Sequence, residues 1–245
     1  MTAQLLTLNP GIDRATLAAR FKSEGRVQVP DVLVPESAEA VRQLLFENTP
    51  WELAWQAGNS GGPQTIDNAA LRSPDAGRLA GQASEATDRS AHAGEYTCRF
   101  ANYPVLKAYL DQRNPGGPYD LLLEQLNMPE MLDLVRDITG VPELIKADAQ
   151  ATLFSGNHFL GYHDDSNKGQ GWRIAYVMGF APDDWRPDWG GYLQFFDENG
   201  DIEFGWKPRF NVLNLMAVPC PHAVSYVPPF APNGRVSITG WFRDR

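Results

Sequence analysis

The residues best suited to chemistry lie in a short polar run, GYHDDS at 161–166, where a strand is expected to end. Side chains alternate between the two faces of a strand, so His163 and Asp165 should share one face while Asp164 points away. We therefore select Asp165 as the partner of His163. A histidine beside acidic residues is more often a surface or capping feature, so this pair needs a further ligand to indicate a metal.

A second histidine, His222, opens a later expected strand after the run PCP at 219–221. Two imidazoles and one carboxylate, with the remaining positions open, form the facial triad of non-haem Fe(II) oxygenases. Taken alone, His222 would be explained equally well as a strand-end histidine bonded to the backbone. Together, His163, Asp165 and His222 predict an iron site.

The C-terminal strand, residues 235–243, has two different faces. One face carries Val236, Ile238 and Phe242, and the other carries Arg235, Ser237, Thr239 and Trp241. A buried arginine can hold a carboxylate through two parallel hydrogen bonds, and a hydroxyl and an indole N–H nearby would complete an anion site. A snorkelling surface arginine is the ordinary alternative.

The elements that must position these residues form a β-rich C-terminal half. Alternating or apolar segments bounded by Gly, Pro, Asn and Asp predict a series of short strands. The expected strands are residues 149–154, 159–163, 172–180, 191–197, 210–217, 222–227 and 235–243. This pattern indicates a mainly β protein with a jelly-roll (double-stranded β-helix) core.

The N-terminal part, residues 1–148, is expected to support that core with a layer of helices. Helical patterns occur at 15–22, 36–47 and 119–138, and 26–33 is expected to be extended. Residues 57–94 contain few large apolar side chains, so we expect a long, mobile loop that is either a lid or a passive insertion.

Composition narrows the function classes. The chain has 245 residues and 43% hydrophobic content, which suits a single domain, and its net charge of −9 disfavours binding to nucleic acid or an anionic membrane. Two distant cysteines and the lack of a signal-like N-terminus favour a reducing, cytoplasmic location. The glycine-rich signatures of nucleotide-binding proteins and the serine-hydrolase elbow are missing.

The combined motifs resemble the Fe(II)- and 2-oxoglutarate-dependent oxygenases, and within them the prolyl-hydroxylase-like branch. The runs at 159–165, 189–193 and 235–242 are similar to the catalytic domain of ribosomal prolyl 3-hydroxylases. The Arg-x-x-x-Thr-x-Trp spacing is also similar to that of hypoxia-sensing prolyl hydroxylases. The chain departs from the family in the longer gap between His222 and Arg235, and in Leu153 and Phe154, which occupy the stretch where a tyrosine is often found.

The resemblance implies a cofactor set of Fe(II), 2-oxoglutarate and dioxygen, with ascorbate as an optional reductant. The implied 2-oxoglutarate-binding residues are Arg235, Thr239, Trp241 and Leu193. Tyr176 is our candidate for the missing tyrosine hydroxyl, with a core aromatic as the alternative.

The implied activity is hydroxylation of an unactivated C–H, with a prolyl residue in a protein or peptide as the preferred substrate. Two alternatives remain open: a hydroxylase of a free amino acid or small metabolite, and a cupin-like, non-oxidative metal-binding protein. The oligomeric state is left open.

Overall fold

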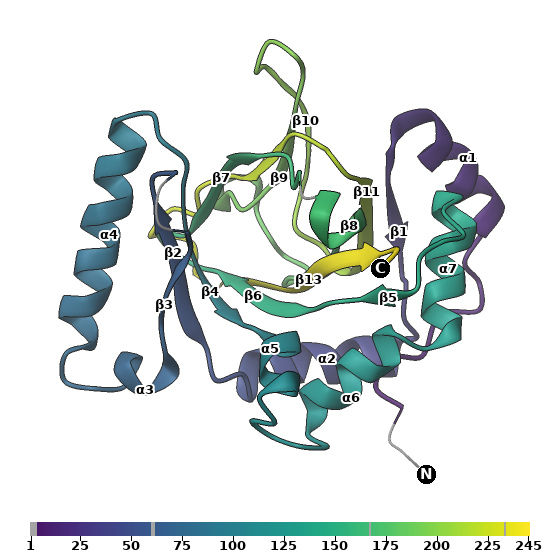
Figure 1. Cartoon of the computed structure of the whole chain (residues 1–245), viewed down its shortest axis with the longest axis horizontal. Coiled ribbons are helices and arrows are strands. Elements are labelled where there is room, and N and C mark those ends of the chain that lie inside the picture. Colours follow the sequence, from purple (N-terminus) through teal and green to yellow (C-terminus); the bar gives the residue numbers. More distant parts are fainter. Residues whose placement is uncertain (1–3, 60–61, 167, 233) are drawn as a thin grey trace.

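A single curled antiparallel sheet dominates the molecule, which is described here from a computed structural model covering residues 4–59, 62–166, 168–232 and 234–245. Along the curl the strands run in the order β1-β11-β8-β13-β6-β4-β7-β12-β9-β10, with β2, β3 and β5 paired at its margins. The expected jelly-roll class is confirmed, and the sheet curls around an interior (Figure 1).

The strands of the C-terminal half lie close to where the sequence predicts them. They are β5 (Lys146–Ala147), β6 (Gln150–Phe154), β7 (Phe159–His163), β8 (Trp172–Phe180), β9 (Leu193–Phe196), β10 (Ile202–Trp206), β11 (Phe210–Ala217), β12 (His222–Val224) and β13 (Arg235–Arg243). Two short 3-10 helices, Lys168–Gln170 and Pro187–Trp189, lie between them. Strands β5 and β10 were not predicted, because one is only two residues long and the other follows a polar turn.

The N-terminal half contains α1 (Arg14–Glu24), β1 (Arg26–Pro30), α2 (Pro35–Glu47), β2 (Glu52–Ala57), β3 (Gln64–Ile66), α3 (Asn68–Leu71), α4 (Ala76–His92), β4 (Thr97–Tyr103), α5 (Val105–Leu110), α6 (Pro118–Leu126) and α7 (Pro129–Thr139). Helix α7 begins at Pro129 and is capped by Gly140 in a left-handed conformation. None of the helices in the described residues is long and apolar enough to cross a bilayer.

Two predictions about residues 1–148 are wrong. This part is more than helical support, because β2 and β4 are strands of the central sheet and β4 pairs with both β6 and β7. The segment 57–94 is also not a long loop: it contains β3, α3 and the 17-residue helix α4, while residues 60 and 61 lie outside the described residues. Helix α4 lies beside β2 and β4 at one margin of the sheet (Figure 1).

Helices cover the outer face of the sheet, and a second cluster fills the inside of the curl. The outer cluster joins α1, α2, α6 and α7 to β1, β8, β11 and β13. The inner cluster is smaller and rich in aromatic residues, including Phe100, Phe154, Phe195 and Trp206. Strand β13 contributes Val236, Ile238 and Phe242 to the outer cluster, so its opposite face is turned toward the interior.

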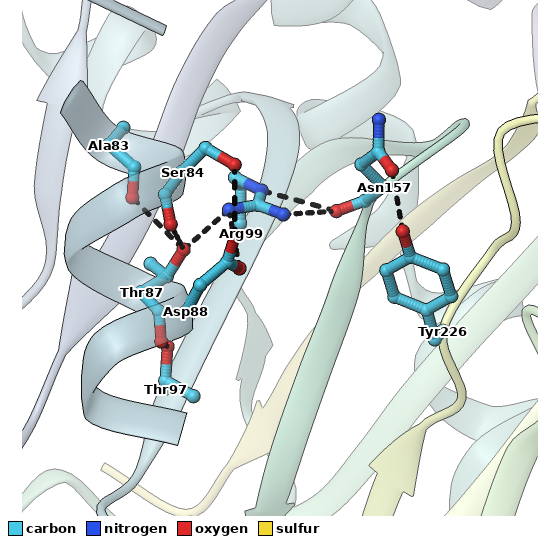
Figure 2. Close-up of polar contacts among 8 residues, drawn as sticks. All are labelled: Ala83, Ser84, Thr87, Asp88, Thr97, Arg99, Asn157 and Tyr226. Carbon is cyan, nitrogen blue, oxygen red and sulfur yellow. Dashed lines mark hydrogen bonds and ion pairs between the residues drawn. The ribbon is translucent and has the colours of Figure 1, made fainter. Parts of the chain in front are cut away.

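Helix α4 buries only Ala83 and Thr87, so apolar packing contributes little to its position. A buried arginine attaches it to the sheet. Arg99 of β4 is 5% exposed. Its guanidinium donates to the Thr87 hydroxyl at 2.5 Å and pairs with Asp88 at 3.3 Å. It also donates twice to the backbone oxygen of Asn157, at 3.1 and 3.0 Å, in the turn before β7 (Figure 2).

We expect Arg99→Met to loosen α4 while leaving the rest of the fold intact. The variant keeps the length of the side chain but leaves the Asn157 oxygen unpaired, a loss on the order of 1–3 kcal/mol. Hydrogen exchange should become faster in α4 and in the turn at Asn157, with α6 and α7 unchanged. Arg78→Met, which removes an exposed arginine of the same helix, is the control. Uniform acceleration over the whole chain would contradict this local role.

Candidate active site

The inside of the curl contains a cavity of about 480 Å³, lined by 26 residues from β2, β3, β4, β6, β7, β8, β9, β11, β12 and β13 and the segments next to them. Its volume is in the range of sites that bind small molecules. His163, Asp165, His222, Arg235, Thr239, Trp241, Tyr176 and Leu193, the residues selected from the sequence, all line it. The chain thus brings every predicted site residue to one cavity.

The candidate metal ligands converge from two paired strands. His163 ends β7, and it lies directly opposite His222 of β12 in the sheet register. With Asp165 they form a group in which one ligand atom from each residue lies within 4.8 Å of the others. The Nε2 atoms of His163 and His222 lie 3.4 and 3.8 Å from the two carboxylate oxygens of Asp165.

The histidine rings are oriented by their other nitrogens. Nδ1 of His163 is 2.9 Å from the backbone oxygen of Gly161, and Nδ1 of His222 is 2.7 Å from that of Cys220. A carbonyl partner requires a proton on Nδ1, which leaves Nε2 unprotonated in the neutral ring and free to bind a metal. This donor set, with few protein ligands and an adjacent cavity, fits Fe(II).

Asp165 reaches the histidines by a route that alternation did not anticipate. Strand β7 stops at His163, and Asp165 takes a left-handed backbone with φ of 59°. The carboxylate is therefore directed inward by a turn and not by strand periodicity. Asp164 instead uses its carboxylate to accept from the backbone N–H of Ser166 at 2.9 Å.

The three candidate ligands shift one another's pKa values. Burial raises the pKa of Asp165, but the neighbouring His163 and His222 outweigh burial and the net shift is downward. Burial and His163 lower the pKa of His222. For His163 burial acts downward, and its contact with Asp165 outweighs this and raises the pKa. The raised pKa of His163 favours a proton on its ring beside the ionised Asp165. A divalent metal requires an ionised carboxylate and neutral imidazoles, so it would take the place of that proton.

Arg235 is the most unusual residue in the cavity wall. It is 6% exposed, its guanidinium lies 4.5 Å from the centre of the Phe154 ring, and its buried Nε has no hydrogen-bond partner among the described residues. Burial lowers the pKa of Arg235 to about 10, so it remains a cation at neutral pH. No carboxylate of the described chain pairs with it, which leaves its charge available to a ligand.

A glycine makes room for this arginine. Gly191 has φ of 69°, and a Cβ at this position would lie 3.3 Å from Cδ of Arg235. The run WGGY at 189–192 resembles the family in sequence, and here it has a physical purpose, because a side chain would push Arg235 out of place. Leu193 follows directly and closes the same wall with a buried side chain.

The other predicted residues differ in what they offer. Thr239 and Trp241 face the cavity, as the two faces of the strand predict. The indole N–H of Trp241 is buried, and no acceptor in the described part of the chain lies in hydrogen-bonding geometry with it. Trp241 stacks on Trp172 with ring centroids 3.9 Å apart. The Tyr176 side chain, by contrast, packs in the outer cluster, where its ring lies 5.0 Å from that of Phe242. Its hydroxyl donates to the backbone oxygen of Asp148 at 2.8 Å, so it is the core aromatic we considered as the alternative.

Several cavity residues were not anticipated. They come from β2 and β4, which the sequence reading did not recognise as strands, and from β6; the polar ones are Gln56, Asn102, Gln150 and Thr152. The alternation of Cys98, Phe100 and Asn102 in a β-rich run is the signal that would have found one wall.

Comparison with known proteins finds a family model that is similar to the C-terminal part of the chain. Residues 149–243 match the family described as the 2OG-Fe(II) oxygenase superfamily. A search of curated proteins finds no match to the chain.

The fold is similar to solved structures of this superfamily. A prolyl-4-hydroxylase from Pseudomonas putida has a TM-score of 0.55 and 16% identity, covering 98% of this chain and 99% of that one. A 2OG-Fe(II) oxygenase family oxidoreductase from Burkholderia pseudomallei has a TM-score of 0.58 and 16% identity, covering 100% and 97%. A prolyl hydroxylase from Trichoplax adhaerens, solved with a hypoxia inducible factor peptide fragment, has a TM-score of 0.51 and 13% identity, covering 94% and 89%. The family match covers the strands that carry the triad and Arg235, so residues 149–243 resemble the 2OG-Fe(II) oxygenase superfamily, and the fold of the whole chain is similar to these solved structures.

Proposed function

We propose that this protein is an Fe(II)- and 2-oxoglutarate-dependent dioxygenase that hydroxylates an unactivated C–H of a prolyl residue in a protein or peptide. His163, Asp165 and His222 would hold the iron, and Arg235 would hold the distal carboxylate of 2-oxoglutarate. With its cofactors bound, a site of this class couples decarboxylation of 2-oxoglutarate to oxidation of a C–H.

The observation that carries the proposal is the buried, unpaired cation of Arg235 in the same cavity as the triad. A buried arginine without an anion is unfavourable, so a chain that keeps one there gains from a carboxylate ligand. A cupin-like metal site that binds only the metal would have no use for this charge. The arrangement therefore favours a dicarboxylate cosubstrate over that alternative.

The chain's own residues would orient both ligands and limit the access of water. The apolar side chains of Leu160, Val177, Leu193 and Val224 line the same cavity as the triad and Arg235. A low-dielectric wall strengthens the charge-assisted pair with Arg235 and keeps a reactive centre from bulk water. Thr239 and Trp241 lie on the same strand face as Arg235 and offer two further donors.

Prolyl specificity is the finer part of the proposal. It is supported by the sequence runs noted above and by the fold shared with prolyl hydroxylases, which is a likeness at 13–16% identity. The barrel does not determine the substrate by itself, so the assignment requires a direct test.

The test is succinate release by protein loaded anaerobically with Fe(II), then supplied with 2-oxoglutarate, oxygen and ascorbate. Proline-containing peptides should raise succinate release well above the rate without substrate, and mass spectrometry should find one added oxygen on the proline. Free amino acids run in parallel test the metabolite alternative. If 2-oxoglutarate is consumed but no peptide gains oxygen, the prolyl assignment fails while the oxygenase assignment stands.

A further inference from the structure

A pair of carboxamides forms a polar patch on the cavity wall that β4 and β6 build. Asn102 of β4 lies opposite Thr152 of β6, and Gln150 of β6 lies opposite Thr239 of β13. Both carboxamides line the cavity, and the side-chain nitrogen of Asn102 is 3.5 Å from the side-chain oxygen of Gln150. This is the long limit of a hydrogen bond, so the two side chains hold each other weakly.

The patch has hydrogen-bonding capacity that the chain does not use. The side-chain oxygen of Asn102 is buried and has no partner within the described residues. The neighbouring Thr152 hydroxyl is already paired with that of Ser237 at 2.8 Å. A buried acceptor without a donor is costly, and native proteins rarely keep one without a reason. Whichever way the Asn102 amide is turned, one of its polar ends lacks a protein partner.

The charges in the cavity limit what this patch can bind. Among the described lining residues, Asp165 carries the only carboxylate and Arg235 the only guanidinium, and there is no lysine. Under the proposed function, Asp165 serves the iron and Arg235 serves 2-oxoglutarate. No charge is then left for the ammonium and carboxylate of a free amino acid, whose burial without partners would be strongly unfavourable.

We propose that Asn102 and Gln150 form a subsite that recognises an uncharged amide of the substrate, such as a peptide group next to the oxidised residue. A carboxamide carries a donor and an acceptor, and a peptide group presents the complementary acceptor and donor. The inference rests on the proposed function and deepens it, because it selects a residue within a peptide over a free amino acid.

The test compares two small probes on protein loaded with Mn(II) and 2-oxoglutarate. N-acetyl-L-prolinamide is neutral and carries two amides, whereas L-proline is a zwitterion of similar ring structure. Mn(II) broadens the proton signals of a ligand that binds beside it, so a titration followed by NMR reports both affinity and location. We expect broadening of N-acetyl-L-prolinamide and little of L-proline.

Asn102→Leu should weaken N-acetyl-L-prolinamide binding by about tenfold or more, since it removes both partners that the amide would use. Gln150→Met and Asn102→Asp should also weaken N-acetyl-L-prolinamide binding. These two variants replace Asn102→Leu in the test if that variant does not fold. Gln43→Ala, which removes an exposed carboxamide from α2, should have no effect. Calorimetric titration should find 2-oxoglutarate binding unchanged in every variant.

Each other outcome has a distinct meaning. Equal binding of L-proline, no binding of the neutral amide to the unsubstituted protein, or equal amide binding in the variants would each overturn the subsite. Weakened 2-oxoglutarate binding in Asn102→Leu would assign the carboxamides to the cosubstrate and overturn it as well. If the unsubstituted protein binds no 2-oxoglutarate, the proposed function itself fails, and this is detected before any amide is added.

Discussion

Alanine at His163, Asp165 or His222 is expected to abolish Fe(II)-dependent 2-oxoglutarate turnover, whereas Asp164→Ala retains most of it. The three ligand atoms converge within 4.8 Å, so the loss of any one leaves two ligands and an incomplete triad. The effect should exceed the roughly 10–100-fold loss seen when only an outer partner of a metal ligand is removed.

Asp164 provides an unusually close control, because it is the adjacent residue with the same side chain. Its carboxylate caps the Ser166 N–H, and its backbone oxygen accepts from the backbone N–H of Cys220 at 3.0 Å, a contact that survives substitution by alanine. Asp164→Asn keeps the cap as well. Metal binding measured by calorimetry with Mn(II), beside succinate release with Fe(II), separates loss of metal from loss of later steps.

The opposite pattern would contradict the site. If Asp164→Ala lost metal while Asp165→Ala kept it, the carboxylate ligand would have been assigned to the wrong residue. Thermal unfolding of each variant without metal is needed beside these measurements. Since Asp165 balances two histidines, its removal changes the local charge, and a variant that no longer folds would give no information on ligation.

The C-terminal half of the fold could be predicted because residues that face the outer core alternate along its strands with residues that face the cavity. In β13, apolar Val236 and Ile238 alternate with residues that face the cavity, and the structure places the two sets on opposite sides. Turn residues between the strands limited each boundary to a few positions. The family motifs lie on these same strands, so predicting the strands also predicted the site.

The segment 57–94 shows where this reasoning failed. We expected a loop because large apolar residues are scarce, but α4 needs few of them: its alanine, arginine, glutamate and glutamine content favours a helix without a broad apolar face. It is attached by Thr87 and by the buried Arg99 from a strand that we had not predicted. A contact made by one polar residue across the sequence has no periodicity to detect.

Asp165 illustrates a different limit. Alternation chose it over Asp164, yet the structure reaches that geometry through a left-handed residue after the strand has ended. Aspartate tolerates this conformation better than most residues, so the sequence allowed the turn without indicating it. For Tyr176 the strand was predictable, but its environment was not: the face it shares with Met178 and Phe180 packs in the outer cluster, and its hydroxyl donates to the backbone oxygen of Asp148.

Arg235→Ala is expected to weaken 2-oxoglutarate binding by roughly 30-fold to several thousand-fold while leaving metal binding unchanged. Arg235 has no role in holding the metal, and it faces the cavity as a buried cation without an acidic partner in the described residues. Removing one partner of a buried, charge-assisted pair costs on the order of 2–5 kcal/mol, and about 1.4 kcal/mol corresponds to a factor of ten.

Two further variants sharpen this result. Arg235→Lys should recover part of the affinity, because an ammonium keeps the charge but cannot form the two parallel bonds of a guanidinium. Arg186→Ala removes an exposed arginine that does not line the cavity, and this variant should bind 2-oxoglutarate normally. Because the unliganded protein buries the Arg235 charge without compensation, Arg235→Met should not lower the thermal stability of the ligand-free protein much, which separates a binding role from a structural one.

Calorimetric titration of 2-oxoglutarate into the Mn(II)-loaded protein measures this without turnover. Parallel Mn(II) titrations must give the same affinity in Arg235→Ala as in the unsubstituted chain. Equal 2-oxoglutarate binding with and without Arg235 would mean that another group holds the distal carboxylate, and the buried cation would then lack an explanation. Absence of 2-oxoglutarate binding to the unsubstituted protein would be the stronger contradiction, since a metal site without a cosubstrate is what the cupin-like alternative predicts.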